Sequence, residues 1–255
     1  MDRIIEYAQK KYPSRFKDKN VQVIEEENFF KVLPNNKLYF FCGKNSKELH
    51  IKNINKMNIK DELLEIHELN TNNLNFKTYS ELFKSFYILD KIQEEYIFTI
   101  QTDGCLCIDS SYNITDFLKY DYIGGYAKQK HWWKETNGLH SYDDFQCFNG
   151  GFSLRNKKAM IDVLNNFKPQ ETVSFYRGCP MEKFPEDLYF VVGMLKLKYN
   201  VGMDEYATNF CTHTSYYKKT FCVHKLENYV NKKELEEFLK YCNEYKNFIK
   251  LENII

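Results

Sequence analysis

Residues 96–104 have the sequence Tyr-Ile-Phe-Thr-Ile-Gln-Thr-Asp-Gly, and this stretch decides the fold. Its first five residues are apolar or β-branched, which predicts a buried strand at Tyr96–Ile100 and a turn at Gln101–Gly104. A carboxylate just beyond a buried strand, with a glycine beside it, can hold a divalent cation close to the backbone. An Asp-Gly pair also forms ordinary turns, so Asp103 alone does not identify a site.

Strands and helices are predicted in alternation on both sides of this stretch. Leu38–Cys42 is a second apolar run, whereas Lys232–Leu251 carries apolar residues at spacings of three and four, as in an amphipathic helix. This alternation predicts one α/β domain over residues 1–255, with a mixed central sheet flanked by helices on both faces. We expect residues 1–20 to form an arm. Further strands are predicted at 21–24, 120–123 and 152–154, and further helices at 59–69, 79–92, 115–119, 157–167 and 186–195.

The composition argues against several classes of function. The 255 residues include 36 Lys and Arg against 35 Asp and Glu, so a net charge of +1 does not favour nucleic-acid binding by bulk electrostatics. The sequence has no apolar run of about 18 residues, so we expect no membrane span. The first residues lack the apolar stretch of a signal peptide. A cytoplasmic protein is therefore expected.

The eight cysteines are scattered along the chain, and they include no C-x-x-C pair. The spacing of Cys105 and Cys107 is too short for a usual zinc knuckle. The sequence therefore predicts reduced thiols and does not favour a zinc site.

Two polar segments lie at predicted element boundaries. Residues 149–151, Asn-Gly-Gly, precede the strand predicted at 152–154, where glycines let the backbone approach a ligand or form a bulge. Glu186 and Asp187 follow Pro185 at a predicted helix start. Their carboxylates either cap the helix or take a proton from a hydroxyl nucleophile. The helix dipole is expected to hold a first-turn acid ionised and to lower its basicity.

Two more segments carry residue types that bind ligands. His224 ends a short apolar run, where a metal ligand from a distant part of the chain is expected, although a lone histidine is more often packed or solvated. Trp132 and Trp133 are adjacent, so their rings point in opposite directions and at least one is expected to be exposed. An exposed indole is a usual platform for a sugar ring. The alternative is that one ring is buried and the other caps the core.

Taken in order, these segments resemble a glycosyltransferase-like family, DUF5672, for which a GT-A fold is expected. The resemblance covers residues from about 21 to 226, and the run Asn-Gly-Gly-Phe-Ser-Leu-Arg at 149–155 is its most specific element. The matching segments are Tyr79-Ser80, Ile100-Gln101-Thr102-Asp103, Tyr120-Asp121-Tyr122-Ile123-Gly124, Asn149–Arg155, Glu186-Asp187-Leu188-Tyr189-Phe190 and Val223-His224-Lys225.

This resemblance implies a glycosyltransferase that moves a sugar from a nucleoside-diphosphate donor, by default a UDP-sugar, to a hydroxyl of a glycan, protein or small molecule. It implies a Mn²⁺ or Mg²⁺ ion held by Asp103 and His224. It also implies an inverting reaction with Asp187 as the general base and Glu186 in reserve. Trp132 and Trp133 would contact the acceptor. The donor would bind at Glu25, Gln101, Asp103, Asn149, Gly150 and Gly151.

One departure from the family pattern concerns the metal. GT-A enzymes usually carry Asp-x-Asp, whereas residues 101–103 are Gln-Thr-Asp, so one of the two acids is missing and metal dependence is open. Two other functions are compatible with the sequence: a non-catalytic carbohydrate-binding module of the same fold, and a nucleotidyltransferase or other nucleotide-sugar enzyme. The last would need a glycine-rich phosphate loop, and neither G-x-x-x-x-G-K nor G-x-G-x-x-G occurs.

Overall fold

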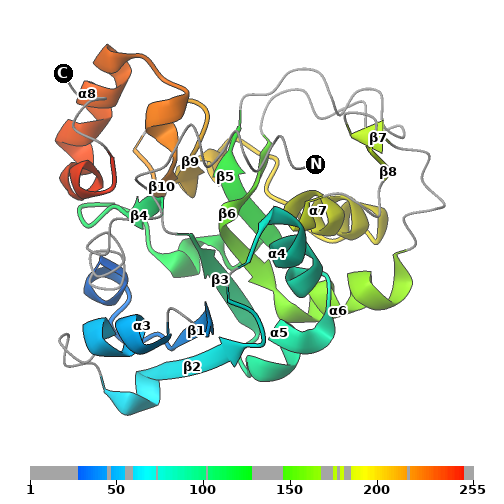
Figure 1. Cartoon of the computed structure of the whole chain (residues 1–255). Helices are drawn as coiled ribbons and strands as arrows, with labels where there is room; N and C mark the ends of the chain where they lie inside the picture. Colours follow the sequence, from blue (N-terminus) through cyan, green and yellow to red (C-terminus); the bar gives the residue numbers. More distant parts are fainter. Residues whose placement is uncertain are drawn as a thin grey trace.

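The computed structural model describes residues 28–44, 47–54, 60–72, 74–101, 103–127, 146–167, 175–176, 179–180, 185–216 and 219–249. It is a mixed α/β structure built around a six-stranded sheet (Figure 1). The strands of this sheet are β3 (Tyr96–Ile100), β4 (Gly104–Leu106), β5 (Tyr122–Tyr126), β6 (Cys147–Asn156), β9 (Cys211–Thr212) and β10 (Cys222–His224). The α-helices are α3 (Lys47–Ile54), α4 (Phe76–Phe83), α5 (Phe86–Lys91), α6 (Lys157–Asn166), α7 (Glu186–Lys196) and α8 (Lys232–Tyr241).

The central sheet has the strand order β3-β6-β5-β9-β10-β4. β6 runs antiparallel to β3 and β5, the strands β5, β9 and β10 run parallel, and β4 is antiparallel to β10 at the edge. The sheet is therefore mixed, as the sequence predicts. β3 is the first strand in this order and β4 is the last, although only residues 101–103 separate them in the sequence.

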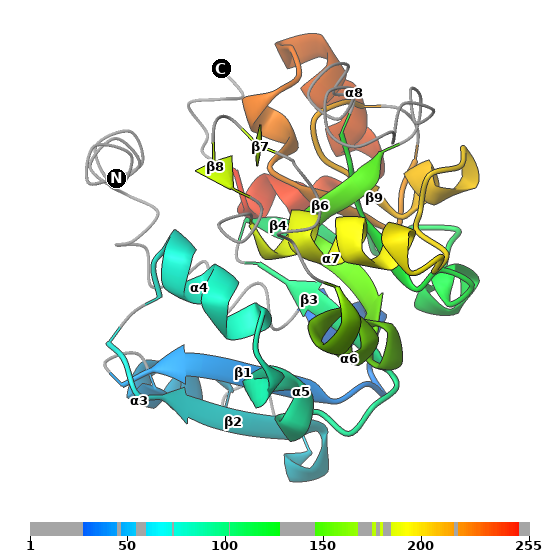
Figure 2. The ribbon, with the colours of Figure 1, turned by 90° about the vertical axis from the view of Figure 1, so that its right-hand side faces the viewer.

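Alternate residues of the central strands face two different hydrophobic clusters, as a period of two requires. On β5, Tyr122 packs with residues of α5, α6 and α7, whereas Ile123 packs on the opposite face with Phe117 and Phe210. Figure 2 shows α6 and α7 lying in front of the sheet. The opposite face is covered partly by the 3₁₀ helices Ile114–Phe117 and Tyr206–Asn209.

The edge pair β4–β10 is covered by α8 and by the 3₁₀ helix Asn243–Asn247. Cys105 and Cys107 pack toward α8, while Leu106 between them packs toward the opposite cluster. Phe238 and Tyr245, one from each helix, are completely buried in this contact. The C-terminal segment is therefore part of the core rather than an appendage.

The helix predicted at 59–69 is wrong. Asp61–Leu63 form one 3₁₀ turn, and β2 (Leu64–Leu69) is a strand that pairs in parallel with β1 (Leu38–Gly43). Residues 64–67, Leu-Glu-Ile-His, alternate between apolar and polar, which is the period of a strand. α3 is the crossover helix that joins the two parallel strands. β7 (Phe175–Tyr176) and β8 (Cys179–Pro180) form a further two-stranded sheet.

Two predicted helices are each interrupted. The segment 79–92 contains the end of α4 and then α5, because Ser85 accepts a hydrogen bond from the N–H of Tyr87 and begins a new helix. In the segment 232–251, α8 ends at Tyr241, and Cys242 leaves helical geometry with φ −113° and ψ 73°. The apolar stripe continues across this second break, so its periodicity does not reveal the interruption.

The strand predicted at 21–24 and the arm at 1–20 lie outside the described residues. None of the helices that the structure describes combines the length and the apolar composition required to cross a bilayer. Seven cysteines of the described segments, at 42, 105, 107, 147, 211, 222 and 242, are free thiols.

Candidate active site

Three segments meet where the chain passes from β3 to β4. Asp103 lies in this connection, His224 ends β10, and Asn149 lies in β6. Nε2 of His224 is 2.8 Å from Oδ1 of Asp103, and Nδ1 is 2.8 Å from Oδ1 of Asn149. His224 is almost fully buried, with 2% of its surface exposed. The fold therefore places one imidazole between a carboxylate and an amide from distant parts of the chain.

β6 reaches this imidazole through a bulge. Adjacent residues of β5 pair with Ser153 and Asn149, so residues 150–152 have no partner in β5. A Cβ atom on Gly151 would lie 2.1 Å from Cε1 of His224, an approach that only glycine allows. The glycines thus lie inside β6, whereas the sequence predicted them before a shorter strand. Gly151 brings the backbone against the histidine ring, whereas Gly150 lies against the side chains of Glu186, Arg155 and Asp187.

The hydrogen bonds fix the orientation of His224. Oδ1 of Asn149 also accepts a hydrogen bond from the backbone N–H of Gly151 at 3.1 Å, so this oxygen is an acceptor. Nδ1 of His224 therefore donates its proton to Asn149, and Nε2 faces Asp103. A neutral ring would direct the Nε2 lone pair at the carboxylate oxygen. Either a proton on Nε2 or a cation shared by the two atoms removes that repulsion.

Asp103 is held as a carboxylate. Burial opposes its ionisation, but the hydrogen bonds and charges of His224 and Lys225 outweigh that effect and hold the pKa of Asp103 well below its ordinary value. Nζ of Lys225 is 2.9 Å from Oδ2 of Asp103. Burial lowers the pKa of His224, although its hydrogen bond to Asp103 opposes the change. One oxygen of Asp103 thus faces His224 and the other faces an ammonium group.

A second histidine, His213, contacts both the backbone and the ring of His224. His213 places Nδ1 2.8 Å from the backbone oxygen of His224, and the two rings stack with centroids 5.0 Å apart and planes 16° from parallel. Burial and the neighbouring His224 lower the pKa of His213 to about 3. His213 is therefore neutral at physiological pH, and it donates a hydrogen bond that holds the end of β10 in place.

The chemistry of Asp103 and His224 fits a divalent cation that takes most of its ligands from substrate and water. A carboxylate oxygen and an imidazole nitrogen face one another, and together they suit Mn²⁺ better than Mg²⁺. The hydrogen bond from Nδ1 to Asn149 is the kind of contact that orients a metal-binding histidine. Because Lys225 covers Oδ2, the two protein ligands would be Oδ1 of Asp103 and Nε2 of His224.

Asp187 approaches the other side of the glycine segment from the first turn of α7. Its Oδ2 accepts a hydrogen bond from the backbone N–H of Gly150 at 3.0 Å, and its Oδ1 accepts one from the N–H of Leu188 at 2.7 Å. Burial, reinforced by the charge of Glu186, raises the pKa of Asp187 to about 7. The sequence predicted lowered basicity from the helix dipole. That prediction is wrong, because burial and a like charge outweigh the dipole.

Glu186 belongs to a buried network that consists of an ion pair and several hydrogen bonds. Its Oε1 is 3.2 Å from Nη2 of Arg155, and the two side chains are 5% and 0% exposed. The backbone N–H of Glu186 donates to the hydroxyl of Ser80 at 2.9 Å, which satisfies a free donor at the start of α7. Arg155 also donates through Nε to Ser153 at 2.9 Å. Glu186 therefore connects α4, β6 and α7 and is not free to exchange protons with a substrate.

Arg155 lies among aromatic rings as well as acids. Its guanidinium carbon is 5.1 Å from the ring centre of Phe83, 5.3 Å from that of Tyr122 and 5.9 Å from that of Phe190. Within the described residues, its Nη1 has no hydrogen-bond partner. Contact with aromatic faces offsets part of the cost of this unpaired donor.

The structure describes only some of the residues predicted to form the site. Glu25, Trp132 and Trp133 lie outside the described residues. Gln101 follows β3 and is half-buried beside the site. Ser80, Arg155 and Lys225 lie in the motif segments, but the sequence alone indicates no role for them. His213 carries no sequence signal, because its partner is a backbone oxygen.

Gly151→Ala is expected to destabilise the protein by about 1–3 kcal/mol, because the new methyl group would occupy the space of the His224 ring. Urea unfolding measures the change. Gly125→Ala is the milder comparison, since its Cβ would lie 3.0 Å from the nearest atom, a side-chain carbon of His213. Equal stability of Gly151→Ala and the wild type would mean that His224 does not pack on β6.

Comparison with known proteins identifies the family. Residues 63–225 match the family described as "Protein of unknown function (DUF5672)". The match covers more than half of the chain and contains Asp103, Asn149, Asp187 and His224. The chain belongs to the DUF5672 family. The DUF5672 match begins at residue 63, so the segment from 21 to 62, which the resemblance included, lies outside it.

No curated protein matches this DUF5672 chain. Among solved structures, it is similar to the inositol-1-phosphate CTP transferase from T. maritima, with 12% sequence identity and a TM-score of 0.41. That similarity covers 88% of this chain and 83% of the other. At this level it supports no conclusion about activity, so the function must be argued from the site itself.

Proposed function

We propose that this protein is a glycosyltransferase of the GT-A type, which transfers a sugar from a nucleoside-diphosphate donor, by default a UDP-sugar, to a hydroxyl acceptor. One observation carries the proposal: contacts lead from Asp187 through Gly150 and Asn149 to His224 and Asp103. A carboxyl that can accept a proton thus lies near charged groups that can act on a diphosphate. Glycosyl transfer needs both functions.

The departing diphosphate must be stabilised as negative charge accumulates on it. Mn²⁺ or Mg²⁺, when bound by Asp103 and His224, would supply Lewis-acid stabilisation of that charge. Asn149 would hold the Nδ1 proton of His224 and so keep Nε2 available as a ligand. Lys225 is 31% exposed, and its ammonium group would add a second positive charge beside the phosphates.

Asp187 would take the proton from the acceptor hydroxyl. Its pKa of about 7 suits this role, because a general base works best when its pKa is near the working pH. Glu186 would act on Asp187 only through its charge, since Arg155 and Ser80 hold its carboxylate in place. Attack by the deprotonated oxygen opposite the diphosphate would invert the anomeric carbon.

Incubation with a panel of nucleotide sugars tests the proposal, with nucleoside-diphosphate release as the readout and NMR of the product for its anomeric configuration. We expect turnover of one nucleotide sugar by the wild type and loss of turnover in His224→Ala. A carbohydrate-binding module would instead bind sugars without any effect of nucleotide or metal. Saturable sugar binding with no nucleotide binding would therefore contradict the proposal.

We expect the protein to bind UDP at least about tenfold more tightly in Mn²⁺ than in EDTA, a difference of about 1.4 kcal/mol. The reason is the pairing of Asp103 Oδ1 with His224 Nε2. Calorimetry in both buffers measures the difference, and Asp103→Asn is expected to abolish it. Equal affinity in Mn²⁺ and EDTA would leave Lys225 as the source of positive charge and remove the metal from the mechanism.

The pH profile provides a separate prediction for Asp187. Because its pKa is raised to about 7, the base is protonated and inactive at lower pH, and kcat/KM should rise with pH and level off above about 7. UDP affinity in Mn²⁺ should change little over the rise, since Asp103 stays ionised. A flat rate profile from pH 5 to 8 would indicate a base with an ordinary carboxyl pKa.

A further inference from the structure

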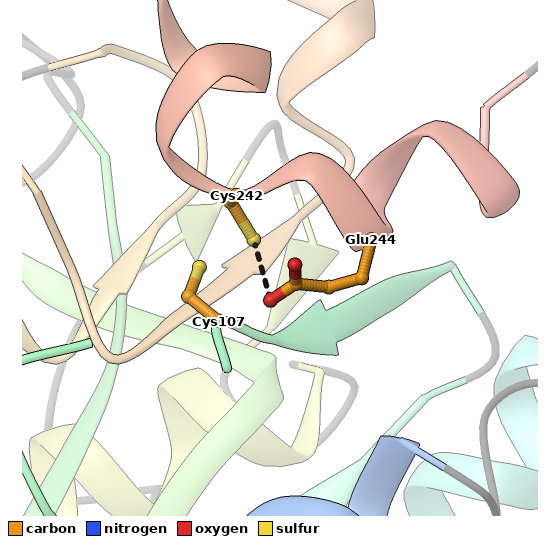
Figure 3. A group of neighbouring side chains, drawn as sticks. All are labelled: Cys107, Cys242 and Glu244. Atoms are coloured by element: carbon orange, nitrogen blue, oxygen red, sulfur yellow. Dashed lines mark hydrogen bonds between the residues drawn. The ribbon is translucent and has the colours of Figure 1, made fainter. Parts of the chain in front are cut away.

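A group of side chains of the types that bind metals lies between β4 and the C-terminal segment (Figure 3). Cys107 follows β4, Cys242 lies at the break after α8, and Glu244 lies in the 3₁₀ helix Asn243–Asn247. Their ligand atoms all lie within 4.8 Å of one another. Cys105 lies on the same face of the chain as Cys107, and its sulfur is 3.9 Å from that of Cys242.

The carboxylate distinguishes this group from an ordinary buried thiol cluster. Sγ of Cys242 is 3.5 Å from Oε1 of Glu244, which also accepts a hydrogen bond from the N–H of Ile108. Figure 3 shows the side chain of Glu244 directed toward Cys242. Buried cysteines that serve only as small apolar residues need no carboxylate among them.

One distance between two of the sulfurs matches tetrahedral zinc. Two thiolates that each lie about 2.3 Å from a zinc ion, at the tetrahedral angle, are about 3.8 Å apart. The observed distance between Cys105 and Cys242 is 3.9 Å. The sulfurs are enclosed, with each cysteine at most 1% exposed, whereas Glu244 is partly exposed.

We propose that Cys107, Cys242 and Glu244 hold a structural Zn²⁺, and that Cys105, whose sulfur lies 3.9 Å from that of Cys242, supplies the fourth ligand when the ion binds. Thiolate sulfur selects zinc over Mn²⁺ and Mg²⁺, so this site would not compete for the ion expected at Asp103 and His224. On binding, each thiol releases its proton to solvent and its sulfur forms a bond to zinc, with no change of oxidation state.

Such an ion would link the C-terminal segment directly to β4. The strand β4 begins at Gly104, immediately after Asp103, and it pairs with β10, which carries His224. Zinc would therefore stabilise the strand pair on which the candidate active site depends, although it lies outside that site. This role requires no contact between zinc and substrate.

Metal titration of the reduced full-length protein, freed of metal by chelation, tests the proposal. We expect one Zn²⁺ per chain, and with Co²⁺ we expect the absorption of a thiolate-to-cobalt charge transfer and of tetrahedral cobalt. At a free Zn²⁺ concentration about 100 times Kd, the melting temperature should rise by roughly 5 °C or more. Absence of the charge-transfer absorption in the wild type would overturn the proposal.

Matched variants identify the ligands. Cys107→Ser and Cys242→Ser should remove most of the cobalt–thiolate absorption, while Cys42→Ser should keep it, because Cys42 is an equally free, buried thiol that lies in β1. His224→Ala should also keep it, which separates this proposal from the proposed glycosyltransferase function. Retention of the absorption in both Cys107→Ser and Cys242→Ser would contradict the assignment.

Glu244→Gln provides a test that does not depend on replacing a buried thiol. Glu244 is partly exposed, so this variant is expected to fold. Its Zn²⁺ affinity should fall at least about tenfold, because a charged ligand is lost. Glu244→Asp, which keeps the charge, should recover part of the loss. Unchanged Zn²⁺ affinity in Glu244→Gln would mean that the carboxylate of Glu244 is not a zinc ligand.

Discussion

Asp187→Asn is expected to lower kcat by about 10²-fold or more, the usual scale for the loss of a general base, while UDP affinity stays near the wild-type value. The amide has almost the same shape but cannot accept a proton at neutral pH. One of its two backbone contacts, to Gly150 or Leu188, would be lost, at a cost of about 1 kcal/mol in the free energy of unfolding. Steady-state kinetics and calorimetry measure the two effects separately.

Asp116→Asn is the matched control, since Asp116 also lies in the first turn of a helix, here the 3₁₀ helix Ile114–Phe117, and accepts a hydrogen bond from a backbone N–H, that of Asn113. It should leave kcat unchanged. If Asp187→Asn transferred sugar at the wild-type rate, Asp187 would only be a helix-capping residue. Glu186→Gln is not a suitable control, because it disturbs the buried contact with Arg155.

Arg155→Met is expected to lower the free energy of unfolding by about 3–5 kcal/mol, the cost of leaving one member of a buried ion pair without its partner. Glu186 would keep only its contact with Ser80. Because α4, β6 and α7 meet at this carboxylate, the loss would affect the packing of all three elements. Chemical denaturation of the variant measures the change. The double variant Arg155→Met with Glu186→Gln should recover part of the loss, because it removes the unpaired charge as well.

Glu68→Gln serves as the control for this ion pair. Glu68 contacts Lys47 at 3.0 Å, but both side chains are more than a third exposed, so its replacement should cost less than about 1 kcal/mol. A similarly small loss in Arg155→Met would mean that the ion pair with Glu186 contributes little to the stability of the protein.

The fold could be predicted where local periodicity and the final packing agree. Tyr96–Ile100 is a strand as expected, and α6 and α7 lie close to their predicted bounds. The prediction failed at 59–69, where the parallel pairing with β1 decides the structure and is not local. It also failed at Cys242, because an apolar stripe can cross a helix break without a change of period.

Part of the site was predictable as a set of residues but not as an electrostatic arrangement. The sequence singled out Asp103, Asn149 and His224, and the structure places His224 within hydrogen-bond distance of each of the other two. It could not foresee that burial would raise the pKa of Asp187, because the enclosing residues come from several elements. In the same way, Cys242 joins Cys105 only after folding, so cysteine spacing gave no sign of their proximity.

The contact between Asp103 and His224 spans 121 positions of the chain. Closing a loop of that length costs about 4 kcal/mol of chain entropy, which the β4–β10 pairing must recover before the contact can persist. In refolding, helices and local strand pairs should therefore regain their structure before the protein regains nucleotide affinity. Nucleotide binding would report on the completion of folding, and a chain released before residue 224 is synthesised would have a partial core and no active site.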